Sequence, residues 1–114
     1  MTKASRLAVV WSSDDPDVAN RVCFMYTYNA KKQKWIDEVT LIVWGPSANL
    51  LANNEELQAY VKKMIQADIK VQACVACANS YGVSDKLRSL GIEVKPMGVP
   101  LSNLIKDDWK VITF

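Results

Sequence analysis

The chain has 114 residues, of which half are hydrophobic and 23% are charged, a composition typical of a globular protein with a substantial core. Fourteen Lys and Arg residues against twelve Asp and Glu residues give a net charge of +2, too small an excess to predict binding to nucleic acid or to an anionic membrane. The length predicts one domain over residues 1–114, and the absence of histidine excludes Ser-His-Asp triads, Cys-His dyads and imidazole metal ligands.

No apolar run approaches the roughly 20 residues that a membrane-spanning helix needs. Residues 1–6 lead directly into a strand-like segment and lack the hydrophobic region of a signal peptide. We therefore expect a cytoplasmic protein that does not enter a membrane.

The first strand is predicted over residues 6–11, which are nearly all apolar, as in a strand that is covered on both faces. Asp15 is the expected N-cap of the first helix, with Pro16 at its first position. Phe24 and Tyr28 lie off the expected buried stripe, so they are either partly exposed or part of a face that contacts another subunit. Cys23 is expected to pack in the core. The expected buried stripe consists of Val18, Val22, Met25 and Tyr26.

The second strand is predicted over residues 39–44 and is broken by Gly45-Pro46-Ser47, with a short helical turn over residues 47–51. Residues 53–56 resemble a capping box that begins the most regular helix, whose apolar face runs from Leu57 to Ile65. The remaining elements are a strand over 70–74, a helix over 75–81, a helix capped by Ser84, a strand over 92–96, a turn capped by Ser102 and a strand over 110–114.

Strands and helices thus alternate along the whole chain, and this pattern predicts an α/β fold of three layers. We expect a mainly parallel sheet of about five strands with helices on both faces, and the direction of the last strand stays open. Ligands bind at the carboxyl ends of such strands. The loops expected at that edge are residues 12–14, 45–47, 74–77 and 98–100.

The strongest local signal is the C-x-x-C motif formed by Cys74 and Cys77, where the third strand gives way to a helix. Unpaired N–H groups at a helix start favour a thiolate, so a cysteine there is expected to titrate below its ordinary value. A thiolate is the nucleophile of disulfide exchange and of sulfur transfer. The motif by itself does not separate a dithiol switch from a persulfide carrier.

Two other interpretations of this motif stay open. The cysteines either fill space under a helix as small apolar side chains, or supply half of a zinc site shared between subunits. We expect no bound cofactor or metal, because the chain has neither G-x-G-x-x-G nor a P-loop, and the acids at 14, 15 and 17 fit helix capping better than a calcium loop.

Three segments resemble the DsrE/DsrF-like superfamily, which includes TusD and YchN-type proteins. These are Cys74 to Gly82, Tyr81 to Val94, and Met97-Gly-Val-Pro-Leu101 with the closing run from Trp109 to Phe114. The resemblance covers essentially the whole chain and implies a flavodoxin-like parallel sheet assembled as a trimer or hexamer. It also implies a persulfide on the cysteine that matches Cys74. The sulfur-relay branch has an arginine where this chain has Tyr81.

Our leading hypothesis is a sulfur carrier or sulfurtransferase-like subunit in which Cys74 attacks the outer sulfur of a donor persulfide and passes it to an acceptor protein. Cys77 then resolves the persulfide or shares the thiolate role. The alternatives are a non-catalytic oligomeric module that binds a small ligand near Gly45 and Gly98, and a dithiol redox protein. Self-association is also expected, because the surplus of aromatic side chains exceeds what one small core is expected to bury; these are Phe24, Tyr28, Trp35, Trp44 and Trp109.

Overall fold

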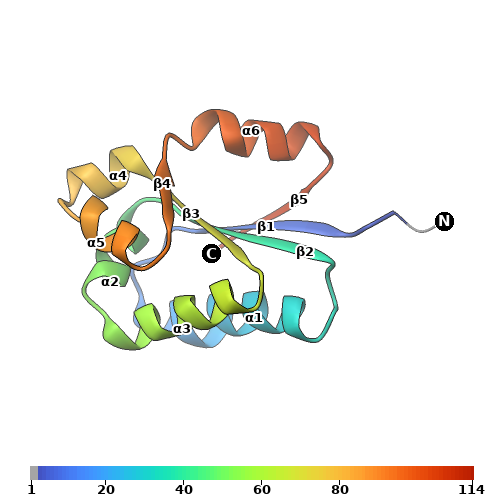
Figure 1. The fold of residues 1–114 in the computed structure, drawn as a ribbon, viewed down its shortest axis with the longest axis horizontal. Helices are drawn as coiled ribbons and strands as arrows, with labels where there is room; N and C mark the ends of the chain where they lie inside the picture. Colours follow the sequence, from blue (N-terminus) through green and yellow to red (C-terminus); the bar gives the residue numbers. More distant parts are fainter. Residues whose placement is uncertain (1–2) are drawn as a thin grey trace.

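The structure, a computed structural model, describes residues 3–114, so the first two residues of the predicted domain lie outside it. It contains a five-stranded sheet in which every strand is parallel to its neighbours, in the order β4-β3-β2-β1-β5 (Figure 1). This confirms the predicted α/β fold, and it settles the direction of the last strand. The strands are β1 (Arg6–Trp11), β2 (Glu38–Val43), β3 (Lys70–Cys74), β4 (Glu93–Lys95) and β5 (Lys110–Thr113).

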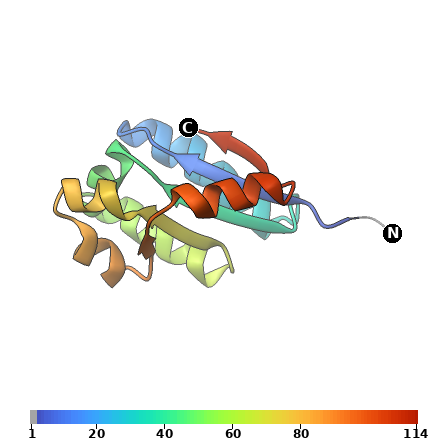
Figure 2. The ribbon, with the colours of Figure 1, turned by 90° about the horizontal axis from the view of Figure 1, so that it is seen from above.

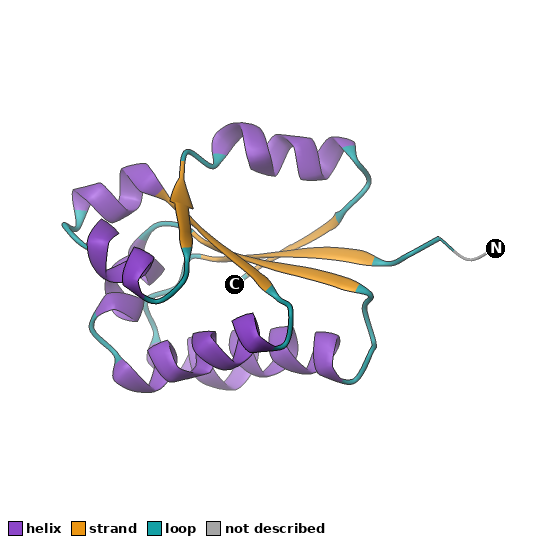
Figure 3. Cartoon of the chain, viewed as in Figure 1, coloured by secondary structure: helices purple, strands orange, loops and turns teal. Residues whose placement is uncertain are grey.

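Helices cover both faces of the sheet, but unequally (Figures 1 and 2). On one face, α1 and α3 lie side by side across the sheet, while α6 lies on the other face (Figure 3). The shorter helices gather near the carboxyl ends of the strands. The helical elements are η1 (Val18–Phe24, π-helical), α1 (Met25–Lys32), α2 (Pro46–Ala52), α3 (Glu55–Gln66), α4 (Val75–Ser80), α5 (Ser84–Ser89) and α6 (Gly98–Lys106).

The larger core cluster lies between the sheet and the helices η1, α1 and α3. Leu41 and Val43 of β2 are fully buried there, and Met64 of α3 packs against the same face. Alternation along the strands sends the intervening side chains to the α6 side. There a smaller cluster forms from Ala8, Ile42, Cys74 and Met97.

The first helix buries a different face from the one expected. Met25 is 53% exposed, and Val22 and Tyr26 are also exposed, whereas Phe24 is fully buried. The buried positions recur at Ala19, Cys23, Thr27 and Ala30, whose small side chains let the helix lie close to the sheet. Phe24 is buried because its ring meets Trp11 edge to face at 4.7 Å and Tyr60 at 5.4 Å.

Helix starts were predicted with mixed success. Asp15 caps the first helix as expected, since its Oδ1 accepts hydrogen bonds from the backbone N–H groups of Asp17 and Val18. In the predicted capping box, Asn54 is the N-cap of α3, and its side chain accepts from the Leu57 N–H at 3.0 Å. The predicted caps Ser84 and Ser102 are both wrong.

Ser84 is the first residue of α5, and its hydroxyl bonds the Asn79 side chain instead of a free N–H of its own helix. Ser102 lies in the middle of α6, which begins at Gly98 and is longer than the predicted turn. The Ser102 hydroxyl donates to the Gly98 carbonyl at 2.8 Å, a bond that serine makes inside a helix.

The expected surplus of aromatic side chains is only partly confirmed. Phe24 is buried, and Tyr28, Trp44 and Trp109 are partly buried. Trp35 is 59% exposed and lies near Tyr26, with ring centroids 6.2 Å apart. None of the helices in residues 3–114 has both the length and the apolar character required to cross a membrane.

Adjacent residues of the first helix provide a test of which face is buried. We expect Phe24→Ala to lower the free energy of unfolding by about 3–5 kcal/mol, because it removes a ring from a closed core. Met25→Ala should change it by less than about 0.5 kcal/mol, because the side chain is exposed. Urea denaturation followed by circular dichroism measures both values, and equal losses for the two variants would contradict the observed packing.

Candidate functional site

The candidate site lies at the carboxyl edge of the sheet, where β3 becomes α4. The buried run from Val71 to Cys74 carries the chain to this edge, and Cys74 is the residue that precedes α4, still in an extended conformation with ψ 119°. Cys77 follows one turn later. Residues three apart on a helix are neighbours, so the spacing brings both thiols to one side of the turn.

The two thiols are in contact, and the loop after β2 closes on them. The Cys77 and Cys74 side chains lie within hydrogen-bonding distance, and the Gly45 backbone N–H donates to the Cys77 sulfur. Gly45 has φ +84°, a conformation that glycine adopts freely and that other residues rarely adopt. Gly45, which lies between β2 and α2, therefore positions a backbone donor at the sulfur pair.

The two cysteines differ in their access to solvent, although both are free thiols. Cys74 is only 7% exposed and lies in the small apolar cluster with Ile42 and Met97. Cys77 is partly exposed and packs at the edge of that cluster. The motif thus places one sulfur inside the protein and one at its surface.

The pKa of Cys77 is raised above its ordinary value, chiefly because the thiol is partly desolvated. The Gly45 N–H opposes this by stabilising the thiolate, while the neighbouring Cys74 adds to the increase. The expectation that the helix start lowers the pKa is therefore wrong for Cys77. Since α4 has only six residues, its dipole is small and desolvation dominates.

Sequence reasoning missed a row of polar side chains next to the cysteines. In the register of β3 and β4, Cys74 lies beside Lys95 and Gln72 lies beside Glu93. The Glu93 carboxylate accepts hydrogen bonds from Lys95 Nζ at 2.7 Å and from Gln72 Nε2 at 2.9 Å. The alternation Glu93-Val94-Lys95 was visible in the sequence, but only the strand order shows that it lies next to Cys74.

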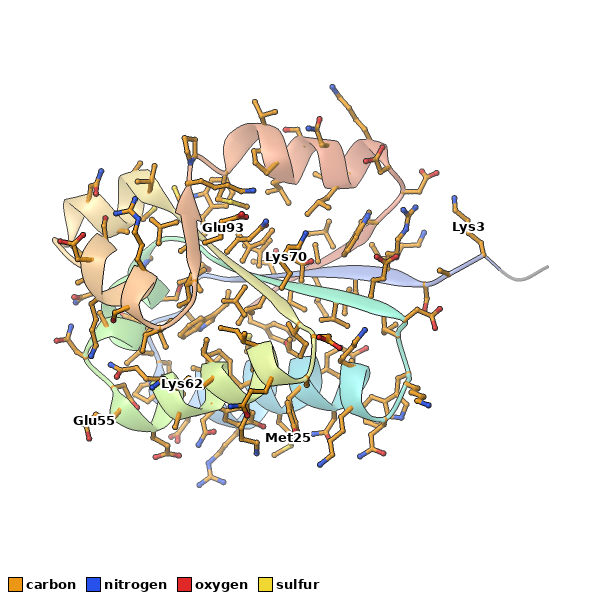
Figure 4. All side chains as sticks on the ribbon, in the orientation of Figure 1. Lys3, Met25, Glu55, Lys62, Lys70 and Glu93 are labelled. Carbon is orange, nitrogen blue, oxygen red and sulfur yellow. The ribbon has the colours of Figure 1, made fainter. Side chains whose placement is uncertain are left out.

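The Glu93 pKa is lowered by this arrangement, first by the hydrogen bond from Lys95 and then by the one from Gln72. The carboxylate is exposed, so these are contacts of a partly hydrated ion pair and not of a buried one. In Figure 4, Glu93 and Lys70 lie on the side of the sheet that faces α6.

Two of the loops expected at the carboxyl edge, residues 12–14 and 45–47, meet there, whereas residues 98–100 form the first turn of α6 instead of a loop. The Ser47 N–H donates to the Ser12 carbonyl at 3.1 Å, and the Ser47 hydroxyl donates to the Trp11 carbonyl, so α2 is anchored to the end of β1. Beside this junction lies an open groove of about 290 Å³. It is lined by Asp14, Pro46, Asn49, Leu50, Asn53 and Tyr81.

A second cavity, of about 260 Å³, lies on the α6 side of the sheet. Its lining includes Thr40, Lys70 and Gln72 of the strands and Leu104 and Trp109 of the α6 segment. Neither of these two hollows is lined by Gly45 or Gly98, so the ligand pocket expected near those glycines stays a prediction.

Cys23 takes no part in the site. It belongs to the larger core cluster, which lies on the opposite face of the sheet from Cys74, and burial raises its pKa to about 12. Its expected role in core packing is confirmed. Within residues 3–114 no three His, Cys, Asp or Glu side chains are grouped to hold a metal ion.

The model of the DsrE/DsrF-like family matches residues 6–114, which include all five strands and both site cysteines. A search of curated proteins gives no match. Among solved structures, the conserved protein of unknown function BT1422 from Bacteroides thetaiotaomicron is similar, with a TM-score of 0.92 and 32% identity. That alignment covers 96% of this chain and 95% of BT1422.

Two more distant structures share the fold. The ychN protein from E. coli has a TM-score of 0.77 and 15% identity, and MTH1491 from Methanobacterium thermoautotrophicum, of unknown function, has 0.75 and 18%. Each alignment covers 96% of this chain and 99% of the other. From the extent of the family match and the agreement in fold, the chain belongs to the DsrE/DsrF-like family.

Proposed function

We propose that the protein is a sulfur carrier or sulfurtransferase-like subunit that holds a persulfide on Cys74. The observation that carries the proposal is the contact between two thiols of unequal access, one buried and one reaching the surface. A carrier needs both properties. The surface thiol exchanges sulfur with partner proteins, and the buried thiol keeps the transferred sulfur away from water and small thiols.

Because Cys77 is the more accessible thiol, we propose that it takes the first step instead of Cys74. The Cys77 thiolate attacks the outer sulfur of a donor persulfide, R–S–SH, so that Cys77–S–SH forms and R–S⁻ leaves. The Cys77 proton passes to this leaving thiolate or to solvent. Because the sulfur moves as a neutral atom between thiolates, the exchange needs no external oxidant or reductant.

Cys74, after its thiol proton has passed to solvent, then attacks the same outer sulfur as a thiolate, so that Cys74–S–SH forms and the Cys77 thiolate leaves. The contact between the two side chains makes this transfer a local one. If Cys74 attacks the inner sulfur instead, a Cys74–Cys77 disulfide forms and hydrosulfide leaves. This second outcome is the resolving reaction expected from the motif.

The apolar side chains around Cys74 support storage of the sulfur. Ile42 and Met97 are almost completely buried beside it, and Leu101 of α6 packs against the same cluster. Such surroundings exclude water from the sulfur and slow its exchange with other thiols. We place the carrier in the cytoplasm, where reducing conditions keep both thiols free, with separate donor and acceptor proteins as partners.

We also propose that the protein associates with further copies of itself, as a trimer or hexamer, through α6 and β5. Every residue of α6 is exposed or partly exposed, and Val99 and Ile105 are 71% and 56% exposed. Val111 of β5, an edge strand, is 40% exposed and projects to the same face of the sheet as α6, because its register partner is Ala8. Exposed apolar side chains on a helix and on the edge strand beside it are typical of an interface.

A dithiol redox protein is the second candidate function, favoured by the same contact between the thiols. Its distinguishing product is a reversible Cys74–Cys77 disulfide. This disulfide forms by exchange with an ordinary disulfide and needs no persulfide. A purely non-catalytic binding module, the third candidate, predicts that neither thiol reacts faster than free cysteine.

Incubation with a persulfide donor, followed by site-resolved mass spectrometry, tests the carrier. We expect wild type to retain one additional sulfur atom on Cys74. Cys77→Ser should load at least about tenfold more slowly, because the exposed entry thiol is lost. Cys74→Ser should load on Cys77 but lose the sulfur rapidly to added thiol.

Cys23→Ser is the matched control and should load like wild type, because that thiol is buried on the other face. If neither Cys74 nor Cys77 is ever modified, the carrier proposal is wrong. A disulfide between them without any persulfide would favour the redox protein.

Light scattering during size-exclusion chromatography tests self-association. We expect wild type to elute as a trimer or hexamer at micromolar concentration, and Ile105→Asp to elute as smaller species, because a buried unpaired carboxylate is costly. Met25→Asp, a similarly exposed position on the opposite face, should leave the assembly intact. A monomeric wild type would contradict the proposal.

A further inference from the structure

The polar row beside Cys74 consists of Lys95, Glu93 and Gln72, and none of these has a part in the sulfur exchange described above. Cys74 and Lys95 are register partners in adjacent parallel strands. Partners in this arrangement project to the same face, and the strands lie about 4.8 Å apart. The stem of Lys95 therefore starts next to the thiol that stores the sulfur.

The ammonium of Lys95 is engaged elsewhere in the resting protein. It contacts Glu93 Oε1 at 2.7 Å, and the same oxygen accepts from Gln72 Nε2 at 2.9 Å. The Lys95 side chain is 36% exposed and that of Glu93 is 55% exposed. Ion pairs in such partly hydrated surroundings contribute roughly 0–1 kcal/mol, so the contact is easily exchanged for another.

Glu93 is held in place independently of Lys95. Gln72 lies directly across from it in the register of β3 and β4 and donates to its carboxylate. Lys70 lies two residues before Gln72 on the same face of β3, and its positive charge also stabilises the Glu93 carboxylate. Departure of Lys95 would therefore leave Glu93 with partners.

The other elements around Cys74 present mainly apolar side chains. Ile42 and Trp44 come from β2 and the loop after it, and Met97 and Leu101 come from the start of α6. The titratable neighbour on α4 is Cys77. Among the residues that the structure describes, Lys95 is the cation whose backbone lies directly beside Cys74.

We propose that Lys95 is a positioning residue that leaves Glu93 and pairs with the anionic sulfur at Cys74 during sulfur exchange. The inference rests on the proposed function, because the anion arises in the exchange between Cys77–S–SH and the Cys74 thiolate. One negative charge is present throughout that step, and it moves between the two sulfur atoms. Lys95 stabilises it without gaining or losing a proton.

The reach of lysine fits this role. Its ammonium is a compact charge on a flexible four-carbon stem. The Cys74 thiolate carries the negative charge at the start of the exchange, and its strand position lies directly beside the stem of Lys95. Glu93 then acts as a latch that holds the cation away from the thiol until an anion forms.

Rates of persulfide loading in a double-mutant cycle test the exchange of partners. We expect Lys95→Met to slow loading of Cys74 by about two- to fivefold, since a partly exposed charge interaction of this kind is lost. Glu93→Gln should accelerate loading by a similar factor, because the competing carboxylate is gone. In the Lys95→Met background, Glu93→Gln should have no further effect.

Lys95→Arg should keep a rate near that of wild type, because it keeps the charge. The matched control is Lys62→Met, at an exposed lysine of α3 on the opposite face (Figure 4), which should load like wild type. If Glu93→Gln has the same effect with and without Lys95, the proposed latch is wrong.

A second measurement works without any persulfide. Alkylation of Cys74 by a small neutral reagent, followed by mass spectrometry between about pH 6 and pH 10, reports the thiolate. At a given pH in this range, we expect Cys74 of Lys95→Met to be alkylated more slowly than in wild type and that of Glu93→Gln more rapidly. Equal profiles in all variants would overturn the role of Lys95.

The two proposals fail in different ways. If wild type takes up no sulfur but the alkylation profiles shift as expected, the carrier function is wrong and the pairing of Lys95 with the sulfur stands. If every variant loads and alkylates like wild type, Lys95 has no positioning role and the carrier function stands.

Discussion

The parallel direction of all five strands is the constraint on which the site depends. In such a sheet every strand ends at the same edge, so the turns that follow β1, β2 and β3 converge there. The bonds from Ser47 to the end of β1 and from Gly45 to the Cys77 sulfur are consequences of that convergence. The strands can be buried on both faces because helices cover both sides.

At this edge, a spacing of three residues places two identical side chains in different surroundings. Cys74 ends a buried strand, and Cys77 lies one helical turn farther toward solvent. Desolvation raises the Cys77 pKa, and the Gly45 N–H only partly compensates for this. Cys77 therefore favours the thiol form more strongly than a fully solvated cysteine does.

The uneven covering of the sheet explains why polar side chains lie so near the sulfur pair. The face under α1 and α3 is almost entirely apolar, whereas α6 covers the other face less completely (Figure 3). This incomplete cover leaves room for the contacts among Gln72, Glu93 and Lys95, and for the cavity beside Pro100. Ile105 of α6 is also exposed on this side.

The sequence by itself determined the order of the elements, because the alternation of apolar strands with capped helices is a local signal. It also placed Cys74 and Cys77 at a strand end, and Cys23 in the core. Tertiary packing decided the rest. The buried face of the first helix was mispredicted because Phe24 packs on Trp11 and Tyr60, which are distant in sequence. Likewise, the proximity of Lys95 to Cys74 depends on which strands pair, and no local pattern encodes that pairing.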